Sequence, residues 1–261
     1  MKGIVLAAGT GSRFAPVTLA FTKHFFPAYD KPVIYYPICV LMIAGIRDIL
    51  LICKSEEEDR YKRLLGDGSE FGVSIQYSNQ DTPKGIAEAF LIGKDFIADQ
   101  SVMLILGDNL LYGPDLGKIF SRCKKNLKGA YLFGYEKSNP EGFGVINLDS
   151  KGRIVSLEEK PEKPKSKLCS VGLYMYDNTV VHHAETVRPS WRNELEILSI
   201  NESYFKLGQI SCENLSKRIR WFDIGTPDGL LNASYQIRHD QNLRRKFIGN
   251  PKDIAIANGW N

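Results

Sequence analysis

The fold is set by an apolar segment that runs directly into a glycine-rich loop: Lys2-Gly3-Ile4-Val5-Leu6-Ala7, then Ala8-Gly9-Thr10-Gly11-Ser12-Arg13. The apolar segment predicts a buried strand over 2–7. In α/β folds ligands bind beyond the carboxyl ends of strands, and small residues let loop N–H groups approach a phosphate. The stretch therefore predicts an α/β protein with an anionic ligand at its first turn. An ordinary tight turn is the alternative.

Two familiar glycine motifs do not fit this loop. A dinucleotide-binding fingerprint needs a third glycine where Phe14 stands. A Walker loop ends in Gly-Lys-Ser/Thr, and Arg13 has no such context. An NAD-binding protein and a P-loop NTPase are therefore disfavoured.

Strand-like and helix-like segments alternate along the first half of the chain. We expect strands over 48–53, 73–77 and 101–106, and helices over 33–44, 56–65 and 85–97. This alternation predicts a mostly parallel sheet with right-handed crossovers. The fold class expected is α/β, with a Rossmann-like mixed, mostly parallel sheet flanked by helices.

The second half of the chain has shorter apolar segments separated by turn signals, which predicts a smaller β lobe. Shorter strands with turn signals between them are expected over 130–135, 143–148, 153–158 and 170–176. Residues 160–167 hold four lysines and two prolines and predict an exposed loop. A terminal helix is expected over 227–246. We find no internal repeat or low-complexity linker, so one compact two-lobed domain is expected.

Composition excludes several classes of protein. The 261 residues carry 34 Lys+Arg against 30 Asp+Glu, a surplus too small to indicate a nucleic-acid-binding surface. The five cysteines (39, 53, 123, 169 and 212) are scattered without a CxxC pair, which argues against disulfides or zinc and for a reducing cytoplasm. The longest apolar run, 33–46, is shorter than the roughly 20 residues that span a bilayer, so it predicts a buried helix. No export signal is evident.

Further motifs follow the loop, and together they carry a family resemblance. They are Thr22-Lys23-His24-Phe25-Phe26-Pro27, Tyr35-Tyr36-Pro37, Ala44-Gly45-Ile46-Arg47, Leu64-Leu65-Gly66-Asp67-Gly68-Ser69, Leu106-Gly107-Asp108-Asn109, Leu157-Glu158-Glu159-Lys160-Pro161 and Trp221-Phe222-Asp223-Ile224-Gly225-Thr226. As a set they resemble the sugar-1-phosphate nucleotidyltransferases over nearly the whole chain. The match is closest to members that use dTTP and glucose 1-phosphate.

The resemblance implies a reaction and a domain plan. A sugar-1-phosphate oxygen attacks the α-phosphorus of a nucleoside triphosphate, giving a nucleotide-sugar and pyrophosphate. A single nucleotidyltransferase domain would comprise a nucleotide-binding lobe (1–128), a smaller sugar-binding β lobe (129–225) and a C-terminal helical segment (226–261). The resemblance also implies a cytoplasmic homo-oligomer, a dimer or a tetramer, without nucleic-acid or membrane partners.

The same resemblance implies the catalytic residues Arg13, Lys23, Asp108 and Asp223. Two anions must meet in this reaction, so the site needs cations more than a base. The planar guanidinium of Arg13 can bind two triphosphate oxygens at once, and Lys23 would neutralise the same phosphates. Asp108 and Asp223 lie 115 positions apart and would hold Mg²⁺, which prefers oxygen ligands. A helix cap for Asp108 and a turn role for Asp223 are the alternatives.

Binding residues are implied on both sides of the catalytic group. The expected nucleotide-binding residues are Leu6, Ala8, Gly9, Thr10, Gly11, Ser12, Arg13, Gln80, Gly85 and Asp108, and Gln80 would read the pyrimidine edge with its amide. The expected sugar-phosphate-binding residues are Gly144, Glu159, Lys160, Ser170, Gly172 and Arg192.

The chain also departs from the family pattern. Ala8 replaces a glycine, Phe143 a tyrosine and Ser199 an acidic residue, and the chain stops at Asn261, short of the longer members' C-terminal region. His24 stands where a glutamine usually lies near the ribose, which leaves the choice between dTTP and UTP open. Transfer to another hexose 1-phosphate and a non-catalytic, nucleotide-sugar-binding regulatory protein are the remaining alternatives.

Overall fold

The structure is a computed structural model that describes residues 1–260. The strands are β1 (Lys2–Leu6), β2 (Pro27–Ala28), β3 (Lys31–Pro32), β4 (Asp48–Cys53), β5 (Ser74–Asn79), β6 (Val102–Leu106), β7 (Asn109–Tyr112), β8 (Ala130–Glu136), β9 (Gly144–Leu148), β10 (Ile154–Glu159), β11 (Leu168–Tyr176), β12 (Ile210–Asn214) and β13 (Arg220–Asp223). The helices are α1 (Tyr35–Ile43), α2 (Ser55–Leu65), α3 (Glu88–Ile92), α4 (Lys94–Ile97), α5 (Leu116–Lys125), α6 (Val180–Thr186), α7 (Ile197–Lys206), α8 (Pro227–Arg244) and α9 (Pro251–Asn258).

One mixed sheet organises the molecule. Its central path runs β10-β9-β11-β6-β1-β4-β5, with β8 paired to β11 and β12 paired to β8. The strands of the first half are parallel, β6 to β1, β1 to β4 and β4 to β5. Strand β11 then runs antiparallel to β6 and joins the two halves of the sheet. This arrangement confirms the expected fold class.

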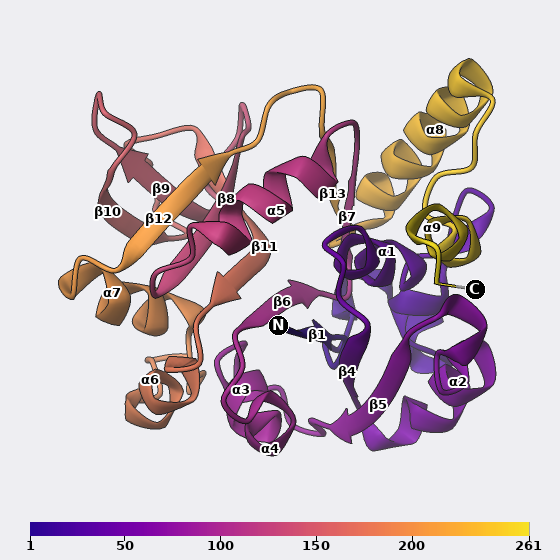
Figure 1. Ribbon diagram of the computed structural model, residues 1–261, viewed down its shortest axis with the longest axis horizontal. Coiled ribbons are helices and arrows are strands. Elements are labelled where there is room, and N and C mark those ends of the chain that lie inside the picture. The colour runs from indigo at the N-terminus through magenta and orange to yellow at the C-terminus, as the bar shows by residue number, and fades with distance from the viewer. Residues whose placement is uncertain (261) are drawn as a thin grey trace.

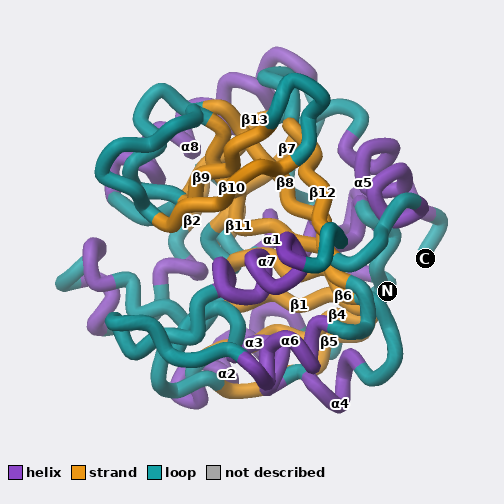
Figure 2. Tube along the Cα trace, turned by 90° about the vertical axis from the view of Figure 1, so that its left-hand side faces the viewer, coloured by secondary structure: helices purple, strands orange, loops and turns teal. Residues whose placement is uncertain are grey.

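The two halves of the sheet carry different neighbours (Figure 1). Strands β9, β10 and β12 lie on the left of that view with α7, whereas β4, β5 and α2 lie on the right with the C-terminal helices α8 and α9. Figure 2 shows α3, α4 and α6 gathered at one end of the molecule, beside the strands of the first half. One continuous sheet thus contains a parallel half and a mostly antiparallel half.

Most expected elements agree with the structure to within two residues, but the predicted helix over 85–97 is wrong. It is two short helices, α3 and α4, separated at Gly93, and residue 85 lies outside both. Gly85 has φ +104°, which a right-handed helix cannot contain. At Gly93 a Cβ would lie 3.1 Å from Ile4 Cδ1, so the break lets the chain approach strand β1 closely.

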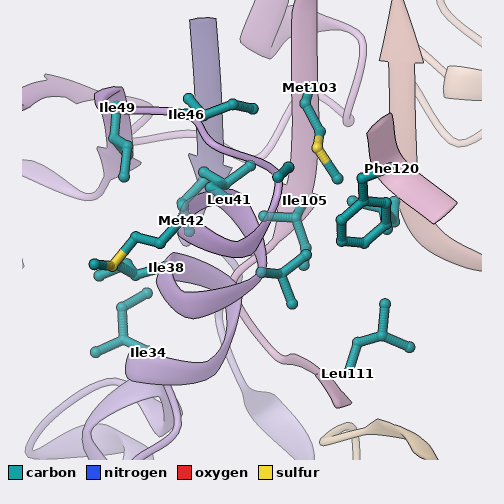
Figure 3. Close-up of a cluster of buried hydrophobic side chains, with 14 of the residues drawn as sticks. Ile34, Ile38, Leu41, Met42, Ile46, Ile49, Met103, Ile105, Leu111 and Phe120 are labelled. Atoms are coloured by element: carbon teal, nitrogen blue, oxygen red, sulfur yellow. The ribbon is translucent and has the colours of Figure 1, made fainter. Parts of the chain in front are cut away.

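The apolar run over 33–46 forms the buried helix that the sequence predicts. Every residue of α1 from Tyr36 to Met42 is buried. Figure 3 shows its side chains packed against those of β4, β6 and α5, including Ile49, Ile105 and Phe120. Burying one such aliphatic side chain contributes about 1.5–3 kcal/mol. Among residues 1–260, no helix combines the length and hydropathy needed to cross a bilayer.

Candidate active site

A cleft of about 740 Å³ opens beyond the carboxyl end of β1, between the two halves of the sheet. Fourteen of the expected site residues line it: Leu6, Gly9, Arg13, Lys23, Gln80, Gly85, Asp108, Gly144, Glu159, Lys160, Ser170, Gly172, Arg192 and Asp223. The remaining loop residues, Ala8, Thr10, Gly11 and Ser12, are not part of this lining. Ala8 is buried beneath the loop, and Thr10 and Ser12 are exposed. Segments that are distant in sequence therefore converge on one cavity.

Asp108 and Asp223 meet because two short strands pair. Strand β7 begins one residue after Asp108, and β13 lies antiparallel to it, with Asp223 opposite Asn109. The Ile224 N–H donates to the Asp108 carbonyl at 2.9 Å. The fold therefore places the two aspartates on adjacent positions across this pair, despite the 115 residues between them.

The two carboxylates differ in their electrostatic surroundings. Lys23 Nζ donates to Asp108 Oδ2 at 2.5 Å. Burial raises the pKa of Asp108, but the charge of Lys23, the nearby His24 and the hydrogen bond from Lys23 together outweigh burial and hold that pKa below its usual value. For Asp223, burial and then the charge of Asp108 raise the pKa to about 6, against the pull of nearby cations. The surroundings of Asp108 thus favour its ionised form. The ionised form of Asp223 is disfavoured, and an additional cation would stabilise it.

A hydrogen-bonded chain fixes the orientation of Asp108. Trp221 Nε1 donates to Asn109 Oδ1, and Asn109 Nδ2 donates to Asp108 Oδ1 at 3.2 Å. A Cβ at Gly172, which has φ +63°, would lie 2.8 Å from Asn109 Nδ2, so glycine is needed for this close approach. The absence of a side chain at Gly172 thus leaves room for Asn109, which in turn orients Asp108.

The glycine loop and the segment after it present the two expected cations. Gly11, in the left-handed region, precedes a 3-10 turn, η1 (Ser12–Phe14), whose buried Phe14 anchors the loop against Phe26. Arg13 is left exposed toward the cleft, where its guanidinium would lie 3.0 Å from a Cβ at Gly225. Lys23 is buried and also donates to the Ile224 carbonyl at 3.1 Å. Both cations therefore face the strand end that carries Asp223.

Gln80 is buried at the nucleotide end of the cleft. Its Nε2 donates to the Gly85 carbonyl at 3.2 Å and to Glu88 Oε2 at 2.8 Å. Both amide hydrogens are committed to these partners, which leaves the carbonyl oxygen to accept a hydrogen bond from a ligand. Thymine and uracil both offer an N3–H donor, so Gln80 suits a pyrimidine-dione base without separating the two.

Replacing Gly85 by Ala is expected to lower the free energy of unfolding by about 2–3 kcal/mol. A Cβ there would overlap the Leu195 carbonyl oxygen and lie 2.6 Å from the Leu195 nitrogen, both backbone atoms, and φ is +104°. Urea denaturation measures the effect. The control is Gly142→Ala, because a Cβ at that exposed glycine meets nothing within 4 Å. Equal stabilities of the two variants would contradict the assigned packing.

His24 is a neutral, buried side chain next to Lys23. Its Nδ1 contacts Thr22 Oγ1 at 2.7 Å and Tyr61 Oη at 2.9 Å. Burial lowers the pKa of His24 to about 4, with Asp108 opposing and Lys23 adding to the shift. Between pH 6.5 and 4 the unfolded chain therefore binds a proton that the folded chain does not.

This difference makes stability fall as the pH is lowered. His24 should account for a loss of about 2 kcal/mol in the free energy of unfolding between pH 7 and pH 5. Denaturation curves of wild type and His24→Gln at the two pH values measure it. The variant, which cannot titrate at this position, should lose less stability by that amount. An identical pH dependence in both proteins would contradict a buried neutral histidine.

The sugar side of the cleft gathers charged residues that partly neutralise one another. Arg192 makes hydrogen bonds of 2.9–3.2 Å to the Glu196 carboxylate and lies 3.9 Å from Glu159. Lys160 Nζ lies 3.7 Å from Glu159 Oε1. Burial raises the pKa of Glu159, against Lys160. The Glu159 carboxylate, which borders Gly144, can accept hydrogen bonds from hydroxyl groups, whereas Arg192 already has its carboxylate partner.

Lys137 also lines the cleft and is not predicted from the sequence to be a site residue. Its Nζ lies 4.3 Å from the centre of the Phe143 ring and 4.2 Å from that of Trp221. Burial lowers the pKa of Lys137, and the charge of Asp223 opposes that shift. In the sequence it is one lysine in a polar turn after a strand, and only the tertiary structure brings the two rings and Asp223 to it.

The residues of the site fit a divalent cation whose other ligands come from a substrate. No cluster of three or more His, Cys, Asp or Glu residues suited to a metal occurs within residues 1–260. Mg²⁺ usually takes only one or two protein carboxylates and completes its shell with phosphates and water. Asp108 and Asp223 offer that number, and burial and then the charge of Asp108 raise the pKa of Asp223, so a bound cation would stabilise its anionic form.

The geometry defines a class of protein that transfers a phosphorus-linked group between anions, and comparison with known proteins gives the family. The sequence profile of the nucleotidyl transferase family matches residues 2–240. The chain belongs to this family, and the resemblance noted in the sequence is confirmed.

Individual relatives and solved structures that resemble this chain carry names more specific than that of the family. Two relatives called glucose-1-phosphate thymidylyltransferase, from Neisseria meningitidis and Mycolicibacterium smegmatis, are each 45% identical over 260 residues, which is all of this chain and 90% of theirs. A crystal structure assigned as glucose-1-phosphate thymidylyltransferase from Bacillus anthracis, in complex with sucrose, superposes with a TM-score of 0.86 at 35% identity, covering 97% of this chain and 99% of that one. A UDP-glucose pyrophosphorylase with bound UDP-glucose shares the fold, with a TM-score of 0.80 at 23% identity over 92% of this chain and 98% of the other.

Proposed function

We propose that the protein transfers a thymidylyl group from dTTP to α-D-glucose 1-phosphate, giving dTDP-glucose and pyrophosphate. The observation that carries this proposal is the pairing of β7 with β13, which sets Asp108 and Asp223 beside Lys23 and near Arg13 at the mouth of one cleft. The names of the relatives that match the whole chain supply the substrates.

The nucleotide lies along the glycine loop in this proposal. Leu6, the loop residues Ala8 to Arg13, Gly85 and Asp108 would surround it, and the carbonyl oxygen of Gln80 would accept the N3–H of the base. The loop N–H groups and the Arg13 fork suit a triphosphate. Because thymine and uracil share the N3–H, UTP stays the alternative nucleotide. The 2′-hydroxyl, which UTP has and dTTP lacks, would lie near His24.

The sugar phosphate lies on the other side of the cleft. Glu159 would accept hydrogen bonds from hexose hydroxyls, and Gly144, Ser170 and Gly172 would leave room for the ring. Lys160 and Arg192 would place positive charge near its phosphate. Other hexose 1-phosphates remain alternatives, since these contacts do not single out one hydroxyl pattern.

The reaction needs charge compensation as the two anions meet. The acceptor phosphate oxygen attacks the α-phosphorus, the α–β bond breaks, and the electron pair leaves with pyrophosphate. Arg13 and Lys23 would stabilise the charge that develops on the phosphates and the leaving group. Asp108 and Asp223 would hold Mg²⁺, which supplies Lewis-acid stabilisation of phosphate oxygens when bound.

Domain plan, assembly and location form part of the same proposal. Residues 1–128, 129–225 and 226–261 would be parts of one domain, which the continuity of the sheet through β6 and β11 supports. The exposed apolar side chains Leu231, Tyr235 and Leu243 on α8 support a homo-oligomer. All five cysteines are free thiols, as expected of a cytoplasmic protein.

The test is pyrophosphate release with Mg²⁺ over a matrix of sugar 1-phosphates and nucleoside triphosphates. We expect the highest kcat/KM for dTTP with glucose 1-phosphate. Preference for UTP or for another hexose would overturn the corresponding substrate alone. Absence of turnover with every pair, together with nucleotide-sugar binding, would favour the regulatory protein instead.

A further inference from the structure

Lys137 is a lysine that lines the cleft and that the proposed function does not use. It follows the last residue of β8, and its backbone N–H donates to the Lys167 carbonyl at 2.9 Å, which fixes where the side chain starts. Phe143, before β9, and Trp221, on β13, pack edge to face with their centres 5.3 Å apart, and the ammonium lies over both rings. The side chain is half-buried and lines the cleft.

The ammonium is oriented, yet it has no anionic partner in direct contact. Within residues 1–260, Lys137 makes no ion pair with an Asp or Glu at 4 Å or less, unlike Lys23, Lys160 and Arg192. Contact with aromatic faces stabilises a cation but does not accept its N–H groups as strongly as an oxygen does. Three donors of a desolvated ammonium are therefore available to a ligand in the cleft.

The position of Lys137 indicates which ligand group would use those donors. Trp221, whose ring contacts the ammonium, lies two residues before Asp223 on β13, and the charge of Asp223 acts on the lysine. Phe143, whose ring also contacts the ammonium, directly precedes Gly144, one of the residues expected to bind the sugar phosphate. The phosphate of a sugar 1-phosphate has to lie between these points, because its oxygen must reach the α-phosphorus near Asp223.

The expected cations of the sugar half are less available for that phosphate. Arg192 is bound through two nitrogens to Glu196 and lies 3.6 Å from Glu194, so carboxylates already compensate its charge. Lys160 is exposed and lies beside Glu159. Lys137 is the cation that burial and two rings hold in place beforehand, and a preorganised cation loses less entropy when it binds an anion.

We propose that Lys137 is a further substrate-binding residue, whose ammonium binds the phosphate group of the acceptor sugar 1-phosphate. The inference rests on the proposed function and adds a residue to it. It predicts that loss of the lysine weakens binding of the acceptor sugar 1-phosphate and leaves binding of the nucleotide largely unchanged.

Steady-state kinetics of Lys137→Met test the inference, since methionine keeps the apolar contact with the rings and removes the charge. We expect the KM for glucose 1-phosphate to rise about ten-fold or more, with the KM for dTTP unchanged within two-fold. Lys137→Arg should recover most of the loss. Lys163→Met, on the exposed loop, is the matched control and should behave as wild type. Thermal unfolding of each variant shows whether it is folded.

The outcomes separate the possible roles. A rise in the KM for dTTP alone would overturn the inference in favour of a nucleotide contact. Unchanged KM values with a lower unfolding temperature would overturn it in favour of simple packing against the two rings.

A binding measurement separates this inference from the proposed function. Glucose 1-phosphate is titrated calorimetrically into wild type and Lys137→Met in the presence of a non-hydrolysable dTTP analogue and Mg²⁺. About ten-fold weaker binding by the variant supports the inference even if wild type shows no turnover, a result that would overturn only the proposed function. Equal binding by the two proteins, or no binding by wild type, overturns the inference.

Discussion

Asp223→Asn is expected to lower kcat by about 10²–10³-fold. The amide keeps the shape of the carboxyl group but removes the charge that, with Asp108, would hold the cation on the phosphates. Pyrophosphate release at saturating substrates measures the loss. The control is Asp99→Asn, at an exposed position outside the cleft. An Asp223 variant with turnover within three-fold of wild type would refute the metal-binding assignment.

The same substitution is expected to stabilise the fold in metal-free buffer. Burial and the charge of Asp108 raise the pKa of Asp223 from 3.8 to about 6, so its ionisation opposes folding as the pH rises through that range. At pH 8 the neutral amide should increase the free energy of unfolding by about 2–3 kcal/mol. Urea denaturation with a chelator present measures it. Lower turnover together with higher stability distinguishes a functional carboxylate from a structural one.

Arg13→Met is expected to lower kcat by about 10²-fold. The loop holds Arg13 over the strand end that carries Asp223, where its guanidinium can bind phosphate oxygens in pairs. Arg13→Lys keeps the charge but loses the planar fork, so it should lie between wild type and the methionine variant. Both are compared by pyrophosphate release.

The control for this series is Arg188→Met, because Arg188 is exposed and outside the cleft. If Arg13→Met changed only the thermal stability and left kcat unaltered, the arginine would be a structural residue of the loop. A loss in kcat that Arg13→Lys restored completely would show that charge alone matters there.

The sheet was predictable because its strands are short apolar runs between helical segments. Strand β4 agrees with the expectation residue for residue, and α1 was evident from an apolar run too long for a strand and too short for a membrane. The break at Gly93 was not predictable, because glycine in a helix-like pattern costs only about 1 kcal/mol. The reason for the break is a contact with Ile4 on another element.

The family resemblance indicated the positions of most site residues, whereas local sequence patterns indicated only their residue types. A strand end followed by Asp108 indicates a ligand site, but the meeting with Asp223 depends on the β7–β13 pair, whose register no local pattern determines. The resemblance implies that Gln80 reads the pyrimidine edge with its amide, and only the structure shows that Gly85 and Glu88 occupy the donor side of that amide. Lys137 gave no signal at all, because its surroundings come from β9 and β13.

The fate of a phosphorus label tests the central claim, attack on the α-phosphorus, most directly. The protein is incubated with glucose 1-phosphate, Mg²⁺ and dTTP labelled at either the α- or the γ-phosphorus, and the products are separated. We predict that the α-label appears in dTDP-glucose and the γ-label in pyrophosphate, in equal amounts. Transfer of the γ-label to the sugar, or its release as inorganic phosphate by the protein itself, would contradict nucleotidyl transfer in this cleft.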